Sequence, residues 1–291
     1  MSNDSPGPVS LFVRLIRTAL IVGGIGMVVL IVLMMLCEDQ LVYHPVGEDG
    51  GIWGPAMIAP EDVTFQSADG TRLHAWYLPA ENPTAVILYC HGNAGNVTHR
   101  AGIIQALRDH AGASVMVFDY RGYGRSEGKP SEVGILADAR AARTALAAKA
   151  GVAESDIVMM GRSLGGAVAV DVAAGDGARA LVLESTFSSM PDVAAHHVPY
   201  LPVHLLMRTR LNSAGKIAEY QGPLLQSHGD ADRVVPYQFG RKLFEATGRP
   251  ESDFITLPGA DHNDAQPMAY YSRLRTFLES LKPSSSLVPS P

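Results

Sequence analysis

The chain of 291 residues is poor in cysteine, with only Cys37 and Cys90. Cys37 ends a long apolar stretch and Cys90 ends a predicted core strand, so the sequence argues against a disulfide framework. Basic residues are also few, since 23 Lys and Arg stand against 29 Asp and Glu. No basic stripe is interleaved with aromatic residues, and no internal repeat is apparent. These absences exclude nucleic acid as an expected partner.

One long stretch lacks charge altogether. Residues Thr18 to Cys37 contain no Asp, Glu, Lys or Arg, and a helix of about 20 residues is roughly 30 Å long, which matches the hydrocarbon core of a bilayer. Arg14 and Arg17 precede the stretch, while acidic residues follow it. We therefore predict a single-pass anchor in membrane lipid. Because positive charge is retained on the cytoplasmic side, we expect the N-terminus to be cytoplasmic and the rest of the chain to lie on the opposite side.

A cleaved signal peptide is the alternative interpretation of this stretch. The apolar core is long for a signal peptide, and no small-x-small site follows it, since Leu36 precedes Cys37. Gly23, Gly24 and Gly26 offer a possible helix-packing face, but the sequence leaves the oligomeric state open.

Composition divides the rest of the chain. We predict an N-terminal segment at 1–40 with a transmembrane helix at about 18–37, a globular domain at 41–281, and a disordered tail at 282–291 that is rich in Pro and Ser. A domain of roughly 240 residues is large enough to bury a full core. The Gly- and Pro-rich residues 47–60 suit a tether between bilayer and domain.

A sharp turn around Ser163 carries the strongest sign of chemistry. The sequence Gly-Arg-Ser-Leu-Gly at 161–165 lies between the apolar runs 157–160 and 166–170, which predicts strand, turn and helix. The serine of such a turn takes strained backbone angles that expose its hydroxyl, and only small residues fit two positions to either side. We therefore predict Ser163 to be a nucleophile. Ser126 also lies between glycines, but its segment opens a loop, so we predict a turn residue there.

Two later loops offer an acid and a base. Asp230 and Asp232 follow the apolar pair 224–225, and His262 follows the apolar residues 255–257. Catalytic groups of an open parallel sheet collect in the loops at the carboxyl ends of its strands. These side chains are therefore expected to meet the nucleophile although they lie far along the chain.

A fourth loop supplies hydrogen-bond donors. His91, Gly92 and Asn93 follow the strand-like run 85–90. They match the His-Gly loop whose backbone N–H, together with that of the residue after the nucleophile, stabilises a tetrahedral oxyanion. We predict Asn93 and Leu164 as the two donors.

Together these segments and the residues around them, from about Leu41 to about Leu281, resemble the α/β-hydrolase superfamily. They look most like the membrane-anchored hydrolases that include eukaryotic protein depalmitoylases. The resemblance implies an α/β fold with a doubly wound, mostly parallel sheet, an antiparallel lead-in and a small helical lid at about 187–222. The spacing His-Gly-x-x-Asp-x-x-Val-Pro in similar enzymes selects Asp232, rather than Asp230, as the acid.

The predicted function is that of a membrane-anchored serine hydrolase. Ser163, His262 and Asp232 would cleave an ester or thioester of a small-molecule or lipid-like acyl substrate through an acyl-enzyme, with no metal or organic cofactor. A small-peptide serine aminopeptidase would use the same triad. A catalytically idle membrane scaffold is the alternative from another class, and the presence of all three triad residues argues against it.

Three histidines of the predicted lid suggest a metal site at first sight. His196, His197 and His204 lack ligand spacing and a nearby set of carboxylates or thiolates. We therefore predict them to be lid histidines rather than metal ligands.

Overall fold

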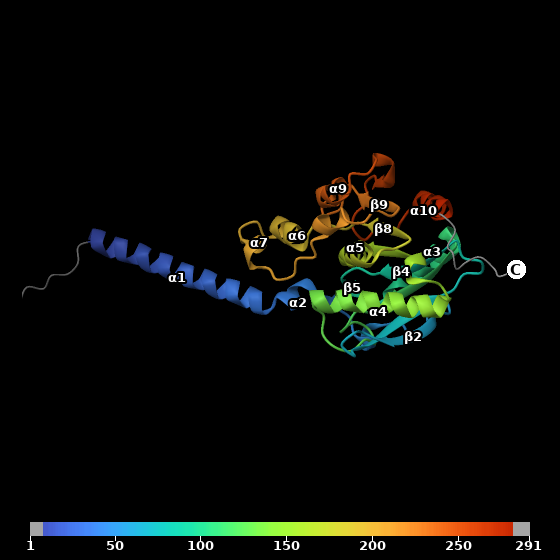
Figure 1. The fold of residues 1–291 in the computed structure, drawn as a ribbon. Helices are drawn as coiled ribbons and strands as arrows, with labels where there is room; N and C mark the ends of the chain where they lie inside the picture. Colours follow the sequence, from blue (N-terminus) through green and yellow to red (C-terminus); the bar gives the residue numbers. More distant parts are fainter. Residues whose placement is uncertain (1–7, 282–291) are drawn as a thin grey trace, which may run out of the picture. The chain divides into compact units, whose positions relative to one another are not determined.

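A computed structural model describes residues 8–281 of the chain (Figure 1). The chain divides into two compact units, with the boundary between Val42 and Tyr43. The predicted disordered tail at 282–291 lies outside the described residues.

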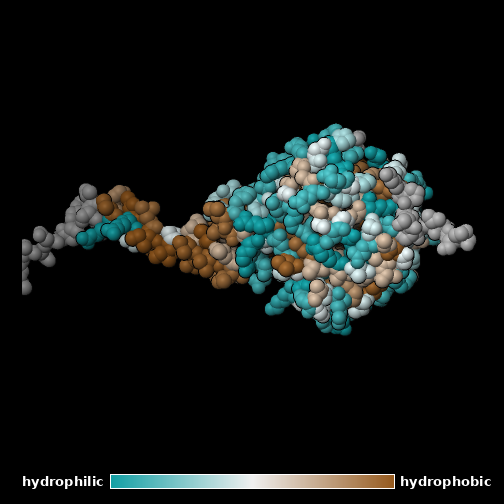
Figure 2. Space-filling view, viewed as in Figure 1, coloured by the Kyte–Doolittle hydropathy of each residue, from teal (hydrophilic) through white to brown (hydrophobic). Residues whose placement is uncertain are grey.

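The first unit contains helix α1, Pro8–Leu36, and the short helix α2, Glu38–Val42. Residues Phe12–Leu36 are long and apolar enough to cross a membrane, by length and composition. Figure 2 shows the hydrophobic side chains that cover most of α1. The helix begins before the uncharged stretch and includes Arg14 and Arg17. Long cationic side chains near a helix end can reach the membrane surface.

The second unit is built of alternating strands and helices. Its strands are β1 (His44–Pro45), β2 (Glu61–Gln66), β3 (Arg72–Leu78), β4 (Ala85–Cys90), β5 (Ala94–Gly95), β6 (Ala113–Phe118), β7 (Ile157–Arg162), β8 (Ala180–Glu184), β9 (Leu224–Gly229) and β10 (Phe254–Leu257). Its helices are α3 (Ala101–Ala111), α4 (Glu132–Ala150), α5 (Leu164–Asp176), α6 (Met190–His197), α7 (Val203–Leu206), α8 (Ser213–Ile217), α9 (Tyr237–Glu245) and α10 (Met268–Ser280).

Eight of these strands form one sheet in the order β10-β9-β8-β7-β4-β6-β3-β2. Strands β4, β6, β7, β8, β9 and β10 are parallel to one another, whereas β2 and β3 form an antiparallel lead-in in which β3 pairs with β6. Strands β4, β6 and β8 are buried along their whole length, which explains their unbroken apolar runs. The predicted fold class is confirmed.

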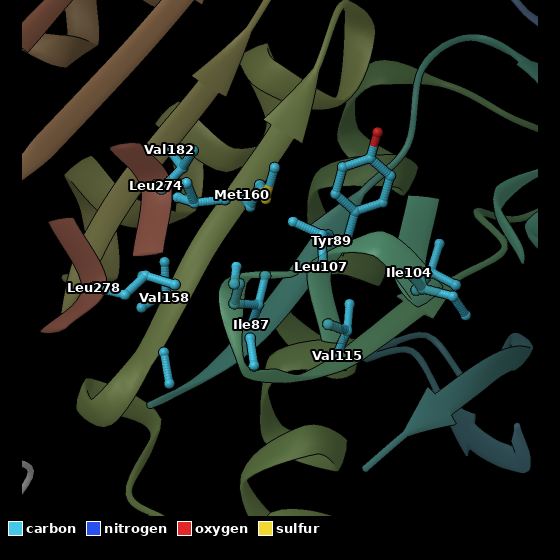
Figure 3. Close-up of a cluster of buried hydrophobic side chains, with 14 of the residues drawn as sticks. Ile87, Tyr89, Ile104, Leu107, Val115, Val158, Met160, Val182, Leu274 and Leu278 are labelled. Carbon is cyan, nitrogen blue, oxygen red and sulfur yellow. The ribbon is translucent and has the colours of Figure 1, made fainter. Parts of the chain in front are cut away.

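The main hydrophobic core lies between the sheet and two helices (Figure 3). Ile87, Val115 and Val158 of the sheet face Leu107 of α3 and Leu274 of α10, and all five are buried. Helices α4 and α5 pack on the other face of the sheet. The carboxyl ends of the parallel strands are thereby held at one edge of a rigid layer.

Two segments lie outside this layered arrangement. Helices α6, α7 and α8 occupy the predicted lid region between β8 and β9. Residues 47–60, whose composition suits a tether, belong to the second unit and pack within it. Trp53 stacks edge-on against Trp76 with ring centroids 5.8 Å apart, and Ile58 is buried in the core. These apolar contacts outweigh the conformational freedom of the Gly- and Pro-rich sequence.

Candidate active site

Ser163 lies at a strained turn between β7 and α5. Its φ of 54° and ψ of −122° are rare for a residue other than glycine. The Ser163 N–H donates to the carbonyl of Glu184 at 3.0 Å, and the Ser163 carbonyl accepts from the Thr186 hydroxyl at 2.8 Å. These bonds hold the strained conformation.

The two glycines of the turn are required by steric contact. A Cβ on Gly161 would overlap the carbonyl oxygen of Gly165, and a Cβ on Gly165 would overlap the carbonyl oxygen of Cys90. Strand β7, helix α5 and strand β4 therefore approach one another more closely than any side chain allows.

His262 and Asp232 lie in the loops after β10 and β9. His262 Nδ1 donates to Asp232 Oδ2 at 2.7 Å. The N–H groups of Val234 and Val235 donate to the other carboxylate oxygen at 2.9 and 2.8 Å. Asp230 is exposed and accepts instead from the Gly259 N–H at 2.6 Å, so it stabilises a turn. The structure brings Asp232, rather than Asp230, to the histidine.

The electrostatic environment keeps Asp232 ionised. Burial by itself raises the pKa of Asp232, but hydrogen bonds from His228 and His262 outweigh this effect and hold the pKa well below its ordinary value. His228 is buried, and its Nε2 lies 3.2 Å from Asp232 Oδ2 and 2.8 Å from the Val235 carbonyl. His228 therefore contacts the acid as well as the backbone of the same loop.

Two side chains fix the loop that carries His262. Asp261 Oδ1 accepts from the His262 N–H at 2.8 Å and from the Arg233 N–H at 3.0 Å. The N–H groups of Arg233 and His262 and the Arg233 guanidinium lower the pKa of Asp261 to about 2. The Arg162 guanidinium donates to the His262 carbonyl. This last bond links the nucleophile turn directly to the histidine loop.

The loop after β4 lies beside Ser163. A Cβ on Gly92 would come within 3.5 Å of the Ser163 Cβ, and β4 is the neighbour of β7 in the sheet. His91 Nδ1 donates to the Gly92 carbonyl at 2.7 Å, and burial lowers the pKa of His91 to about 4, so its ring is neutral. Leu164 is the first residue of α5, where backbone N–H groups have no partner within the helix.

A buried carboxyl next to this turn was missed by the sequence analysis. Glu184 ends β8, and its side chain is buried close to Arg162. Burial raises the pKa of Glu184, against the opposing effects of Arg162, Tyr270 and Gln266. The sequence does show an acidic residue at the end of an apolar strand, which could have indicated a buried carboxyl group. It does not show that Arg162, Tyr270 and Gln266 lie near it.

The lid histidines have structural partners. His197 Nε2 donates to the Val234 carbonyl at 2.9 Å, which ties the lid to the loop of Asp232. His204 Nε2 lies 3.9 Å from Asp192, and His196 packs edge-on against Phe239. Within residues 8–281, no group of three or more His, Cys, Asp or Glu side chains is arranged to hold a metal ion.

Comparison with known proteins places the chain in a superfamily. The serine aminopeptidase S33 family model matches residues 81–214. The α/β-hydrolase domain-containing protein WAV2 of Arabidopsis thaliana is 33% identical, over 91% of this chain and 96% of that protein. The chain belongs to the α/β-hydrolase superfamily. An uncharacterized protein of Mycobacterium tuberculosis is 37% identical to this α/β-hydrolase, over 86% of this chain and 90% of that protein.

Two further similarities concern the fold and the membrane. The esterase Pf2001 of Pyrococcus furiosus has a TM-score of 0.63 and 21% identity, over 82% of this chain and 98% of that chain, which shows a shared fold. An uncharacterized membrane protein of Saccharomyces cerevisiae is 34% identical, over 76% of this chain and 80% of that protein. The prediction of a hydrolase is confirmed at the level of the superfamily. The closer resemblance to depalmitoylases stays a prediction.

Proposed function

We propose that this α/β-hydrolase is a membrane-anchored serine hydrolase that cleaves acyl esters or thioesters of a small-molecule or lipid-like substrate. The observation that carries the proposal is the strained backbone of Ser163 at the turn between β7 and α5. A non-glycine residue is held at positive φ only where the surrounding structure enforces it, and such strain is concentrated at functional sites. The hydrogen-bonded pair of His262 and Asp232 lies in the adjoining loops.

Acylation follows from these groups. The Ser163 hydroxyl attacks the carbonyl carbon of the substrate, and His262 Nε2 takes its proton. Asp232 accepts the Nδ1–H bond, fixes the tautomer and stabilises the imidazolium. Its lowered pKa keeps it ionised while the histidine is charged. The tetrahedral intermediate collapses when His262 returns the proton to the leaving alcohol or thiol, which leaves an acyl-enzyme on Ser163.

Deacylation repeats the same transfers with water. His262 takes a proton from a water molecule that attacks the acyl carbonyl, and then returns it to Ser163 as the carboxylic acid leaves. In both steps negative charge develops on the carbonyl oxygen. The N–H groups of Asn93 and Leu164 would donate to that oxygen, and losing one such donor costs roughly 10²- to 10³-fold in kcat in comparable sites.

A small-peptide aminopeptidase is the second candidate, favoured by the family model that matches residues 81–214. Such an enzyme needs a carboxylate to bind the substrate's ammonium group. Asp192 of the lid is already engaged by Lys242 at 2.8 Å and by the Ser188 hydroxyl at 2.6 Å. Glu132 accepts from the N–H groups of Arg210 and Leu211. Because both carboxylates are already bonded within the protein, neither is available to bind a substrate's ammonium group, which favours acyl substrates over peptides.

The lid and the N-terminal helix support a lipid-like substrate. Tyr200 and Leu205, in the segment from α6 to α7, are 74% and 83% exposed as whole residues. Exposed apolar groups of this kind suit contact with acyl chains or with lipid. We propose that residues 1–40 anchor the hydrolase domain, 41–281, with its lid at about 187–222.

A substrate panel tests the proposal. The full-length protein in detergent would be assayed with acetyl and medium-chain esters, thioesters and aminoacyl amides. We expect medium-chain esters or thioesters to react fastest and Ser163→Ala to abolish turnover. Ser272→Ala, an exposed serine on α10, is the matched control. Faster cleavage of aminoacyl amides would favour the aminopeptidase, and the absence of any turnover would favour a scaffold.

A further inference from the structure

The first residues of the second unit pair with the predicted oxyanion loop. Strand β1, His44–Pro45, forms a separate two-stranded parallel sheet with β5, Ala94–Gly95, in which His44 lies opposite Ala94. The Val46 N–H continues the pairing by donating to the Gly95 carbonyl at 3.2 Å. Strand β5 begins directly after Asn93. The chain that leaves the membrane segment therefore borders the proposed oxyanion donor.

His44 holds Asn93 through both polar ends of its amide. The His44 N–H donates to Asn93 Oδ1 at 3.1 Å, and Asn93 Nδ2 donates to His44 Nδ1 at 2.9 Å. The Tyr123 hydroxyl also donates to Asn93 Oδ1, at 3.0 Å. The side chain of Asn93 is thus fixed by strand β1 and by the loop after β6 at once. A fixed side chain restricts the rotation of its own backbone, and with it the direction of the Asn93 N–H.

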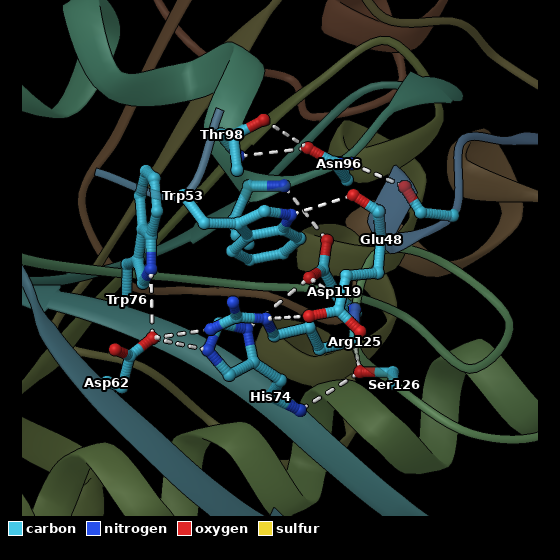
Figure 4. Close-up of polar contacts among 12 residues, drawn as sticks. Glu48, Trp53, Asp62, His74, Trp76, Asn96, Thr98, Asp119, Arg125 and Ser126 are labelled. Atoms are coloured by element: carbon cyan, nitrogen blue, oxygen red, sulfur yellow. Dashed lines mark hydrogen bonds and ion pairs between the residues drawn. The ribbon is translucent and has the colours of Figure 1, made fainter. Parts of the chain in front are cut away.

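The residues after His44 are fastened to the same group of loops. Asn96 Nδ2 donates to the carbonyls of Val46 and Gly47 at 3.3 and 3.2 Å, and the Gly124 N–H donates to the Val46 carbonyl at 2.9 Å. Figure 4 shows Asn96 in this network, and Glu48 bound to Arg125 at 2.8 Å. His44 therefore approaches Asn93 from a segment that is itself held in place.

We propose that His44 is a positioning residue that holds the Asn93 N–H in the direction required by the oxyanion. The inference rests on the proposed function, because it concerns the oxyanion hole of the same site. Oxyanion stabilisation depends on donors that are already aligned before charge develops. The few residues that join the membrane segment to the hydrolase domain would then complete the catalytic site as well as tether it.

Kinetics of the full-length protein test this role. His44→Ala removes the bond from Asn93 Nδ2 to the imidazole, and we expect kcat to fall about 10- to 100-fold, with KM within about threefold of wild type. His44→Asn restores an acceptor near the position of Nδ1 and should regain most of the activity. Asp49→Asn, an exposed residue of the same segment that does not contact Asn93, is the control and should keep wild-type kcat.

Two further measurements separate positioning from general damage. The affinity for a trifluoromethyl ketone, which forms a tetrahedral adduct, should fall in proportion to kcat/KM in His44→Ala, while the affinity for the carboxylic acid product stays constant. Asn93→Ala keeps the backbone N–H but removes the amide, so the double variant should lose no more than either single variant. Should His44→Ala fail to fold, Tyr123→Phe, which removes the other bond to Asn93 Oδ1, should show the same loss in kcat.

The outcomes distinguish this inference from the proposed function. Folded His44→Ala with kcat within about twofold of wild type, a loss confined to KM, no rescue by His44→Asn, or additive losses with Asn93→Ala would each overturn the positioning role. Wild-type protein without hydrolysis that depends on Ser163 would instead overturn the proposed function.

Discussion

At the scale of single residues, environment gives two nearby aspartates different tasks. Asp232 is buried and accepts hydrogen bonds from His262, His228 and two backbone N–H groups. Asp230 is exposed and accepts from the N–H of Gly259. The sequence alone left both open, and it was the resemblance to similar enzymes that selected Asp232.

Substitution of each aspartate tests this assignment. Asp232→Asn removes control of the His262 tautomer and should lower kcat on the order of 10⁴-fold. Asp230→Asn weakens a turn and should lower the free energy of unfolding by about 1 kcal/mol with kcat nearly unchanged. Steady-state kinetics and chemical denaturation measure both effects. A greater loss of kcat in Asp230→Asn would reverse the assignment.

The buried acid Glu184 makes a prediction about pH. Burial raises its pKa, so the folded chain holds the proton to higher pH than the unfolded chain. The stability that this group contributes is fully present below the unfolded pKa of about 4.3 and is lost as pH rises through the folded pKa. Glu184→Gln cannot lose a proton and should flatten this decrease.

Denaturation of the full-length protein in detergent from pH 4 to pH 8 measures the effect. Glu81→Gln, an exposed acid before β4, controls for the loss of one carboxyl group. An equally steep decrease in Glu184→Gln and in wild type would show that Glu184 does not titrate as described.

At the scale of secondary-structure elements, the strand-turn-helix unit around Ser163 was predictable from sequence. Its signal is local: an apolar run, two glycines at fixed positions and a second apolar run. Contacts between short segments that lie far apart in the chain leave no such pattern in the sequence. The pairing of His44 with Asn93 and the packing of Glu184 near Arg162 depend on sheet register and loop paths, which hydrophobic periodicity does not encode. The packing of residues 47–60 was not predictable for the same reason, because Trp53 contacts His74 and Trp76 of strand β3.

The glycines of this unit give a direct test of its packing. A Cβ at Gly161 would overlap backbone atoms, so Gly161→Ala should lower the free energy of unfolding by about 1 to 3 kcal/mol or more. Gly102→Ala is the matched control, since nothing lies within 4 Å of a Cβ at that position in α3. It should be neutral or stabilise by roughly 0.5 to 1 kcal/mol. Equal stability of the two variants would contradict the close packing of β7 against α5.

At the scale of the whole molecule, the proposed anchor would determine where the hydrolase meets its substrate. Helix α1 has the length and composition of a membrane span, and a relative from yeast is named as a membrane protein. The arginines before the span and the acids after it favour a cytoplasmic N-terminus. The hydrolase domain would then act on the opposite side of the membrane.

Fractionation tests this topology. The full-length protein should stay in the membrane fraction after an alkaline wash, because a spanning helix is not released by pH or salt. Protease added from the non-cytoplasmic side should digest the hydrolase domain. Release by alkali would exclude the anchor, and complete protection from the protease would reverse the orientation.

The central claim is that Ser163 is the nucleophile, and adduct mapping tests it most directly. The full-length protein would be treated with a fluorophosphonate and digested with trypsin, which releases Ser163 at the start of the peptide 163–179. We predict a single phosphonyl adduct on Ser163 and no adduct in Ser163→Ala with an unchanged circular dichroism spectrum. An adduct on another serine, or continued labelling of folded Ser163→Ala, would contradict the account.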